Sequence, residues 1–185
     1  MISDRSWGPG SPRENITKRF ASAAAIAGVF LAGAVATAPT AFAGDRTCRG
    51  TLGSGTVNGN VRVPAGATCT LRLTKVKGNV IVAKNGTLRS YSARVDGNIQ
   101  GTSYRHVIAR STYVDGSIQL KSGGGLVLTK NVVDGDIQVF SNKRGLKDIY
   151  DNRVDGNLQC TSNVPAPKGA RNKVKGNKEG QCRRF

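Results

Sequence analysis

The stretch Val95-Asp96-Gly97-Asn98-Ile99 decides the fold, because close copies of it recur along the chain at nearly constant spacing. The starting valines step by 19, 19, 19, 19, 21 and 20 residues. A repeat of this length, made of short β-favouring runs and turn residues, is typical of a solenoid in which each repeat forms one coil. The other copies are Val57-Asn58-Gly59-Asn60-Val61, Val76-Lys77-Gly78-Asn79-Val80, Val114-Asp115-Gly116-Ser117-Ile118, Val133-Asp134-Gly135-Asp136-Ile137, Val154-Asp155-Gly156-Asn157-Leu158 and Val174-Lys175-Gly176-Asn177-Lys178.

Apolar and polar residues alternate within each coil, as expected for strands with one buried face. We number each coil from its valine, which is position 0. Positions 4 and 6 are mostly apolar, whereas positions 3, 5 and 7 are mostly polar. Each coil therefore predicts two or three short strands that face a common interior. A second apolar patch follows around positions 12 to 14 and comprises Cys69 and Leu71, Leu88, Val107 and Ile108, Leu126 to Leu128, and Leu146 and Ile149.

Position 2 is glycine in every coil and is preceded by Asp, Asn or Lys. Asp-Gly and Asn-Gly pairs favour turns that need a positive φ, which glycine adopts at little steric cost. We therefore expect each of these glycines to occupy a tight corner with a left-handed backbone.

Coil length and turn pattern over residues 57–177 resemble the right-handed parallel β-helix, the superfold of pectate lyases, polygalacturonases and many secreted passenger domains. The resemblance is one of shape only. It implies an all-β, right-handed parallel β-helix of about seven coils of 19–21 residues, and parallel crossovers are generally right-handed. We expect residues 44–56 to form an N-terminal cap and residues 178–185 a C-terminal cap.

The first 43 residues have the pattern of a secretory signal peptide. A basic stretch ends at Thr17-Lys18-Arg19, an apolar run extends from Phe20 to about Val35, and Ala41-Phe42-Ala43 forms a small-x-small cleavage site. An uncleaved membrane anchor is the alternative, although no second hydrophobic segment follows. We expect a secreted or cell-wall-associated protein, and the Ala-rich leader resembles those of actinobacterial exported proteins.

The remainder of the chain is strongly basic. Residues 44–185 contain 24 Lys and Arg against 9 Asp and Glu, a net charge of about +15. This charge favours anionic partners such as wall teichoic acids, uronic-acid polysaccharides, extracellular DNA or anionic lipids. The alternative is that the basic residues only keep a repetitive β-surface soluble. A platform for neutral sugars is disfavoured, because after Trp7 is removed only six aromatic residues remain as candidates: Tyr91, Tyr104, Tyr113, Tyr150, Phe140 and Phe185.

Four cysteines remain after cleavage, an even number in an exported chain, which predicts disulfides. Cys48 and Cys69 are 21 residues apart, and Cys160 and Cys182 are 22 apart. Residues one coil apart stack at about 4.8 Å, a separation that a disulfide tolerates. We therefore expect Cys48–Cys69 and Cys160–Cys182 bonds at the two ends of the solenoid.

Stacked coils turn each repeat position into a row of side chains, and two rows bear on function. The carboxylate row at position 1 is a weak candidate for a calcium site, and its alternative role is in the turn itself. The amide residues at positions 3 and 5 are expected to project from one sheet, where they stabilise the stack and offer a polar surface to an extended polymer. The carboxylate row is Asp96, Asp115, Asp134 and Asp155, and the candidate polymer-binding amides are Gln100, Gln119, Gln138 and Gln159.

Two longer coils place extra residues near 141–145 and 163–168, and insertions in solenoids often lie on the functional face. The basic residues there are further candidates for polymer binding: Lys143, Arg144, Lys168 and Arg171.

The sequence therefore predicts a secreted, non-enzymatic β-helix that binds an anionic extracellular or cell-wall polymer, with no cofactor and no specific nucleic-acid partner. The alternative is a polysaccharide lyase or hydrolase of the β-helix type. No Ser-His-Asp set or zinc-binding motif is present, and His106 is the only histidine.

Overall fold

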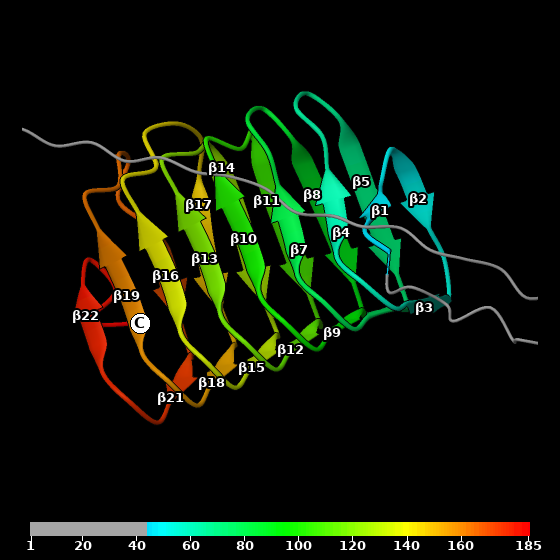
Figure 1. Cartoon of the computed structure of the whole chain (residues 1–185). Coiled ribbons are helices and arrows are strands. Elements are labelled where there is room, and N and C mark those ends of the chain that lie inside the picture. The colour runs from blue at the N-terminus through cyan, green and yellow to red at the C-terminus, as the bar shows by residue number, and fades with distance from the viewer. Residues whose placement is uncertain (1–43) are drawn as a thin grey trace, which may run out of the picture. The chain divides into compact units, whose positions relative to one another are not determined.

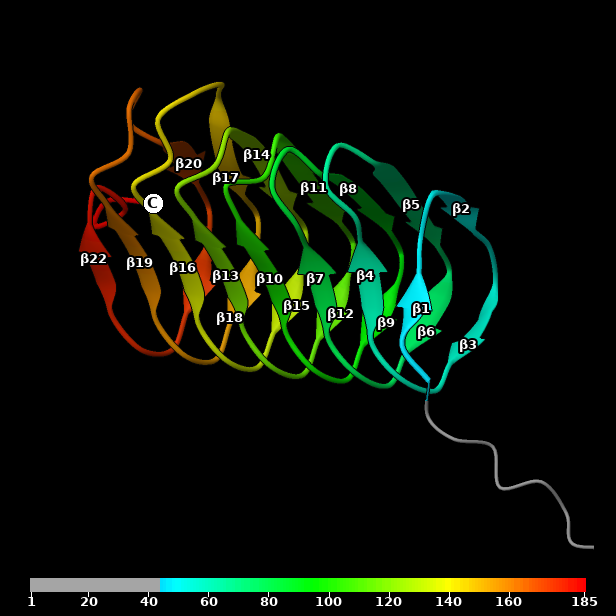
Figure 2. The same ribbon diagram turned by 45° about the horizontal axis from the view of Figure 1, so that its top comes forward.

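The computed structural model describes residues 44–185, so the predicted signal peptide lies outside the described residues. Within this range the chain forms 22 strands and no helix, and hence no helix able to cross a membrane. The strands make three parallel sheets, named A, B and C, and successive coils add one strand to each (Figures 1 and 2). The predicted all-β parallel solenoid of about seven coils is confirmed, whereas its right-handed sense stays a prediction.

The three sheets run side by side along the solenoid. Sheet A contains β1 (Arg46–Thr47), β4 (Val61–Val63), β7 (Val80–Val82), β10 (Ile99–Thr102), β13 (Ile118–Lys121), β16 (Ile137–Phe140), β19 (Leu158–Thr161) and β22 (Lys178–Gly180). Sheet B contains β2 (Gly50–Leu52), β5 (Thr68–Arg72), β8 (Thr87–Tyr91), β11 (His106–Arg110), β14 (Gly125–Thr129), β17 (Lys147–Tyr150) and β20 (Lys168–Ala170). Sheet C contains β3 (Gly55–Val57), β6 (Thr74–Val76), β9 (Arg94–Val95), β12 (Tyr113–Val114), β15 (Val132–Val133), β18 (Arg153–Val154) and β21 (Lys173–Val174).

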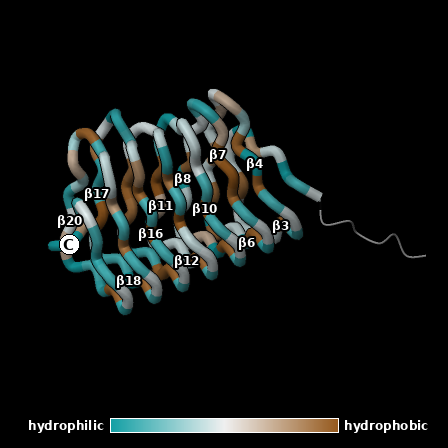
Figure 3. Tube along the Cα trace, turned by 60° about the vertical axis from the view of Figure 1, so that its left-hand side comes forward, coloured by the Kyte–Doolittle hydropathy of each residue, from teal (hydrophilic) through white to brown (hydrophobic). Residues whose placement is uncertain are grey.

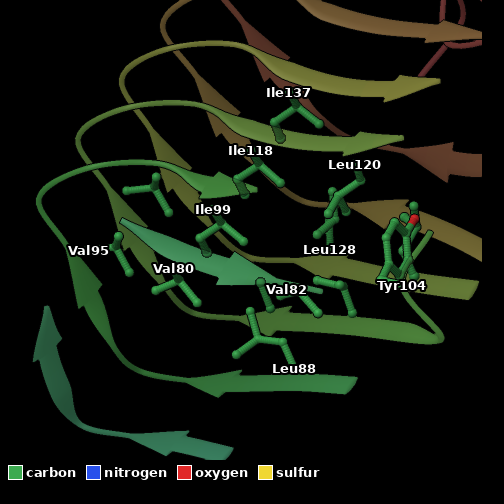
Figure 4. Close-up of a cluster of buried hydrophobic side chains, with 14 of the residues drawn as sticks. Val80, Val82, Leu88, Val95, Ile99, Tyr104, Ile118, Leu120, Leu128 and Ile137 are labelled. Carbon is green, nitrogen blue, oxygen red and sulfur yellow. The ribbon is translucent and has the colours of Figure 1, made fainter. Parts of the chain in front are cut away.

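Equivalent residues of successive coils pair directly, so the hydrophobic pattern of one coil becomes continuous stacks in the interior. Ile99, for example, pairs with Val80 on one side and Ile118 on the other. These side chains and Val95 are fully buried and pack together (Figure 4). Figure 3 shows that hydrophobic and hydrophilic stretches alternate along each coil. The alternation at positions 4 to 7 therefore predicted the inward and outward faces of sheet A.

The longer fifth coil departs from the predicted interior. Leu146, expected in the apolar patch, is 64% exposed. The interior place that pairs with Leu126 is taken by Lys147, which is only 1% exposed. Tyr104, a candidate for a binding platform, is also buried, and its hydroxyl donates a hydrogen bond to Asn142 Oδ1 at 2.9 Å. Leu146, which was expected in the interior, is therefore exposed, and Tyr104, which was a candidate for the surface, is buried.

The repeat glycines fulfil a different requirement from the predicted one. Within residues 44–185, positive φ angles occur at five glycines, Gly50, Gly55, Gly66, Gly145 and Gly180, none of which is at position 2. The position 2 glycines are instead needed because successive coils approach closely at the corner between sheets C and A. A Cβ on Gly97 would lie 2.7 Å from Asn79 Oδ1 and 2.8 Å from Gly78 O, well inside contact distance.

The left-handed backbone conformation also occurs at other corners, at residues other than glycine. Single residues with φ near +50° follow the strands of sheets A and B and redirect the chain toward the next sheet. Most of them still donate their backbone N–H to the next coil; Ser103 N, for instance, lies 3.0 Å from Lys121 O. The serines in this conformation are Ser92, Ser103, Ser111, Ser122, Ser141 and Ser162.

Two disulfides join the cysteine pairs predicted from their spacing. Cys48 bonds to Cys69 with a Cα–Cα distance of 5.4 Å, and Cys160 bonds to Cys182 at 5.3 Å. Each links neighbouring coils at one end of the solenoid. Residues 44–56, predicted as a cap, include strands β1 and β2, which extend sheets A and B.

We predict that Gly97→Ala destabilises the protein by about 1–3 kcal/mol, because the added methyl group overpacks the corner against the backbone of the preceding coil. Chemical denaturation monitored by circular dichroism measures the change. Gly53→Ala is the matched control, since a Cβ there meets nothing within 4 Å. Equal stability of the two variants would show that coil contact does not explain the repeat glycines.

Candidate functional site

The predicted carboxylate row lies at the corner between sheets C and A, beside basic residues of sheet C. Arg94 reaches two of its members, with Nε 3.0 Å from Asp96 Oδ1 and Nη2 3.0 Å from Asp115 Oδ1. Lys175 Nζ lies 2.7 Å from Asp155 Oδ2, and this hydrogen bond lowers the pKa of the Asp155 carboxyl. The row is thus interleaved with cations that offset its charge. Within residues 44–185, no group of three or more His, Cys, Asp or Glu side chains is placed to hold a metal ion.

Asp134, the remaining carboxylate of the row, has an uncharged partner. The Tyr113 hydroxyl donates a hydrogen bond to Asp134 Oδ2 at 2.6 Å, which raises the pKa of Tyr113. The Arg94 guanidinium also stacks over the Tyr113 ring, 4.2 Å from its centroid. Tyr113 is therefore engaged in the surface network of this corner.

We predict that calcium leaves the melting temperature unchanged and that Asp115→Asn costs less than about 1 kcal/mol, because exposed ion pairs contribute little to stability. Thermal unfolding with calcium and with a chelator measures both effects. Asp148→Asn, on sheet B outside the row, is the control. A calcium-dependent rise in melting temperature that Asp115→Asn abolishes would identify the row as a metal site.

The two amide rows lie in different places, although the sequence predicted one surface for both. The position 5 glutamines lie on the outer face of sheet A, in register from coil to coil. Gln100 Nε2 donates to Gln119 Oε1 at 3.2 Å, and Gln138 Nε2 donates to Gln159 Oε1 at 3.0 Å. These glutamines form a neutral, half-buried row that is partly satisfied by its own members.

The position 3 residues do not project from sheet A, which corrects the prediction. They lie at the corner between sheets C and A, where each side-chain oxygen accepts the backbone N–H of the equivalent residue one coil on. Asn79 N lies 2.7 Å from Asn60 Oδ1, and Asn98 N lies 2.9 Å from Asn79 Oδ1. The ladder continues through Ser117, Asp136, Asn157 and Asn177. The side-chain oxygens of this ladder thus accept hydrogen bonds that join successive coils.

The basic residues of the longer coils are spread over several contacts. Arg171 forms a two-contact ion pair with Asp151, in which Nε lies 2.6 Å from Oδ1 and Nη2 lies 2.9 Å from Oδ2. Lys143 Nζ donates to Ser162 O at 2.9 Å. Lys168 is exposed on sheet B and pairs in register with Asp148. Arg144 is exposed on the loop before β17. The structure therefore does not gather these four residues into one cluster.

A basic surface that the sequence analysis did not single out lies on the outer face of sheet B. We call it the arginine face and define it by Arg72, Arg89 and Arg110, which are exposed on the consecutive strands β5, β8 and β11. Arg72, Tyr91 and Arg110 stack in register on successive coils. The Arg72 guanidinium lies over the Tyr91 ring, 5.2 Å from its centroid. This geometry places the backbones that carry Arg72 and Arg110 about 10 Å apart.

Carboxylates do not neutralise the arginine face. The seven ion pairs found within residues 44–185 all use other basic residues, chiefly along sheet C and its corners. Within residues 44–185, Asp148 on β17 is the only acidic residue in the strands of sheet B. It lies two coils from Arg110 in the register of the sheet. Three exposed guanidinium groups without carboxylate partners therefore lie together on β5, β8 and β11.

Comparison of the chain with family models, with curated proteins and with solved structures finds no match. The resemblance to pectate lyases thus stays a likeness of shape.

Proposed function

We propose that this chain is an exported, non-enzymatic solenoid that binds anionic polymers of the cell surface or its surroundings through the arginine face. The observation that carries the proposal is the concentration of guanidinium groups without carboxylate partners on β5, β8 and β11. An exposed guanidinium binds carboxylate or phosphate groups through paired hydrogen bonds. Arg72 and Arg110 lie two coils apart in one row, about 10 Å from each other, so an extended polymer along the stack can reach both.

Export to an oxidising compartment is supported by two disulfides and by the leader pattern of residues 1–43. The net charge of about +15 on residues 44–185 supports long-range attraction to polyanions. An actinobacterial source fits the composition of the leader. These features favour an extracellular or wall-associated protein.

The test is to mix the purified protein with teichoic acid, polygalacturonate and neutral dextran, with and without calcium, and to follow polymer size by chromatography. We expect both anionic polymers to be retained at unchanged length, and dextran not to be retained. Retention should disappear at high salt, because the screening length falls from about 10 Å at 0.1 M to about 3 Å at 1 M. Shortened polymers would instead show a lyase or hydrolase.

We predict that the triple variant Arg72→Gln, Arg89→Gln, Arg110→Gln binds the anionic polymers about 10-fold more weakly, since each exposed contact contributes roughly 0.5 kcal/mol. The control triple variant is Arg62→Gln, Arg94→Gln, Arg171→Gln. It removes the same charge from arginines that already have carboxylate partners. Equal losses in the two variants would mean that net charge, and not the arginine face, determines binding.

The glutamine row of sheet A remains the other proposed contact surface. The variant Gln119→Ala, Gln138→Ala tests it in the same assay. We expect a smaller loss than for the arginine triple variant, because these side chains are neutral and each already hydrogen-bonds within the row.

A further inference from the structure

A pocket of about 440 Å³ lies beside the arginine face, on the side where sheet A turns into sheet B. It is bounded by residues of four coils: Asn85, then Arg105 and His106 at the start of β11, then Gly124 and Gly125, and finally the loop of Arg144 to Leu146. This volume falls within the range typical of small-ligand sites. The pocket exists because the fifth coil is two residues longer than the regular coil and its extra residues form one wall.

Consecutive glycines line the pocket and allow the coils around it to pack closely. A Cβ on Gly124 would collide with the backbone oxygen of Arg105, and a Cβ on Gly125 would lie 3.1 Å from Leu146 O and 3.4 Å from His106 Cε1. Gly145, with φ +69°, faces them, and a Cβ there would lie 2.8 Å from Gly125 N. The floor is therefore bare backbone, on which the His106 ring and the loop of the fifth coil pack closely.

A buried lysine holds the wall that carries Arg144. Lys147 Nζ donates hydrogen bonds to the backbone oxygens of Arg144 at 3.2 Å, Gly145 at 2.8 Å and Val164 at 2.9 Å. Burial lowers the pKa of Lys147, and these three oxygens take the place of water around its ammonium group. The loop is thus fixed from inside the solenoid, which presents Arg144 at the pocket on a positioned backbone.

The chemistry of the lining is that of an anion site with room for hydroxyl groups. Arg105 and Arg144 are both exposed, neither belongs to an ion pair within residues 44–185, and no carboxylate lines the pocket. Burial and the nearby Arg89 lower the pKa of His106, which favours the neutral ring at neutral pH. His106 and the Asn85 amide supply uncharged hydrogen-bonding groups, while the exposed Leu146 side chain supplies an apolar surface.

We propose that this pocket binds a single sugar-sized unit that carries a carboxylate or a phosphate group. Arg105 and Arg144 engage the oxyanion, Asn85 and His106 hydrogen-bond to hydroxyl groups, and Leu146 contacts the apolar face of the ring. The proposal rests on the proposed function, to which it adds a specific subsite: the arginine face attracts the chain of charges, and the pocket selects one unit of it.

The experiment is calorimetric titration of the disulfide-bonded protein with three monosaccharides: glucuronate, glucose 6-phosphate and neutral glucose. We expect saturable binding of at least one of the two acids and none of glucose; the acid that binds more tightly identifies carboxylate or phosphate as the preferred group. The variant Arg105→Gln, Arg144→Gln should lose at least about 10-fold in affinity, which corresponds to about 1.4 kcal/mol. The control Arg72→Gln, Arg110→Gln, which changes the arginine face by the same charge, should retain the affinity.

Unchanged melting curves will show that the variants are folded, since all four arginines are exposed. The pocket proposal is overturned if neither acid binds, if glucose binds equally well, or if the control loses as much affinity as the pocket variant. Retention of anionic polymer by the same preparation separates this failure from that of the proposed function. If polymer is retained while the acids do not bind, only the subsite is wrong; if neither is bound, both proposals fail.

Discussion

The structure depends on the exact stacking of each coil on the one before it, one strand spacing apart. At the corner between sheets C and A, two features of the repeat act together. The position 3 side chain of one coil accepts the backbone N–H of the next, as Asn79 does from Asn98 at 2.9 Å. The absence of a side chain on Gly97 leaves room for that same Asn79 oxygen. The Gly-Asn pair is therefore a packing unit between coils, and the three sheets are held in register by it.

Fixed register also determines where charge is neutralised. Because every coil presents the same corner, the position 1 carboxylates lie beside the basic residues of sheet C, and Arg94 contacts carboxylates of two successive coils. The acidic residues are thereby largely used at one side of the solenoid. The arginines of β5, β8 and β11 on sheet B have no such partners, and this is why we propose sheet B as the side that anions prefer.

The period, the buried stacks and the disulfide pairs were predictable because each depends on residues repeated at fixed spacing. The row of buried asparagines Asn131, Asn152 and Asn172 could also have been predicted, since each stands two residues before a repeat valine. These asparagines form a ladder inside the solenoid, in which equivalent side chains of successive coils hydrogen-bond to each other. Asn131 Nδ2, for example, donates to Asn152 Oδ1 at 2.9 Å. Lys147 was not predictable, because a lysine in an interior register requires three backbone oxygens that only the folded loops bring together. The arginine face was missed because Arg72 and Arg110 share a repeat position that Tyr91 occupies in the coil between them, and Arg89 joins them only through the register of sheet B.

The central claim, that anionic polymers bind on one side of the solenoid, is tested most directly by arginine-specific labelling with phenylglyoxal in the presence and absence of polygalacturonate. Mass spectrometry of the peptides reports which guanidinium groups the polymer covers. The account predicts strong protection of Arg72, Arg89 and Arg110, and little change at Arg62 and Arg153, which are exposed on the other two sheets. Equal protection on all sides, or protection confined to sheets A and C, would contradict it.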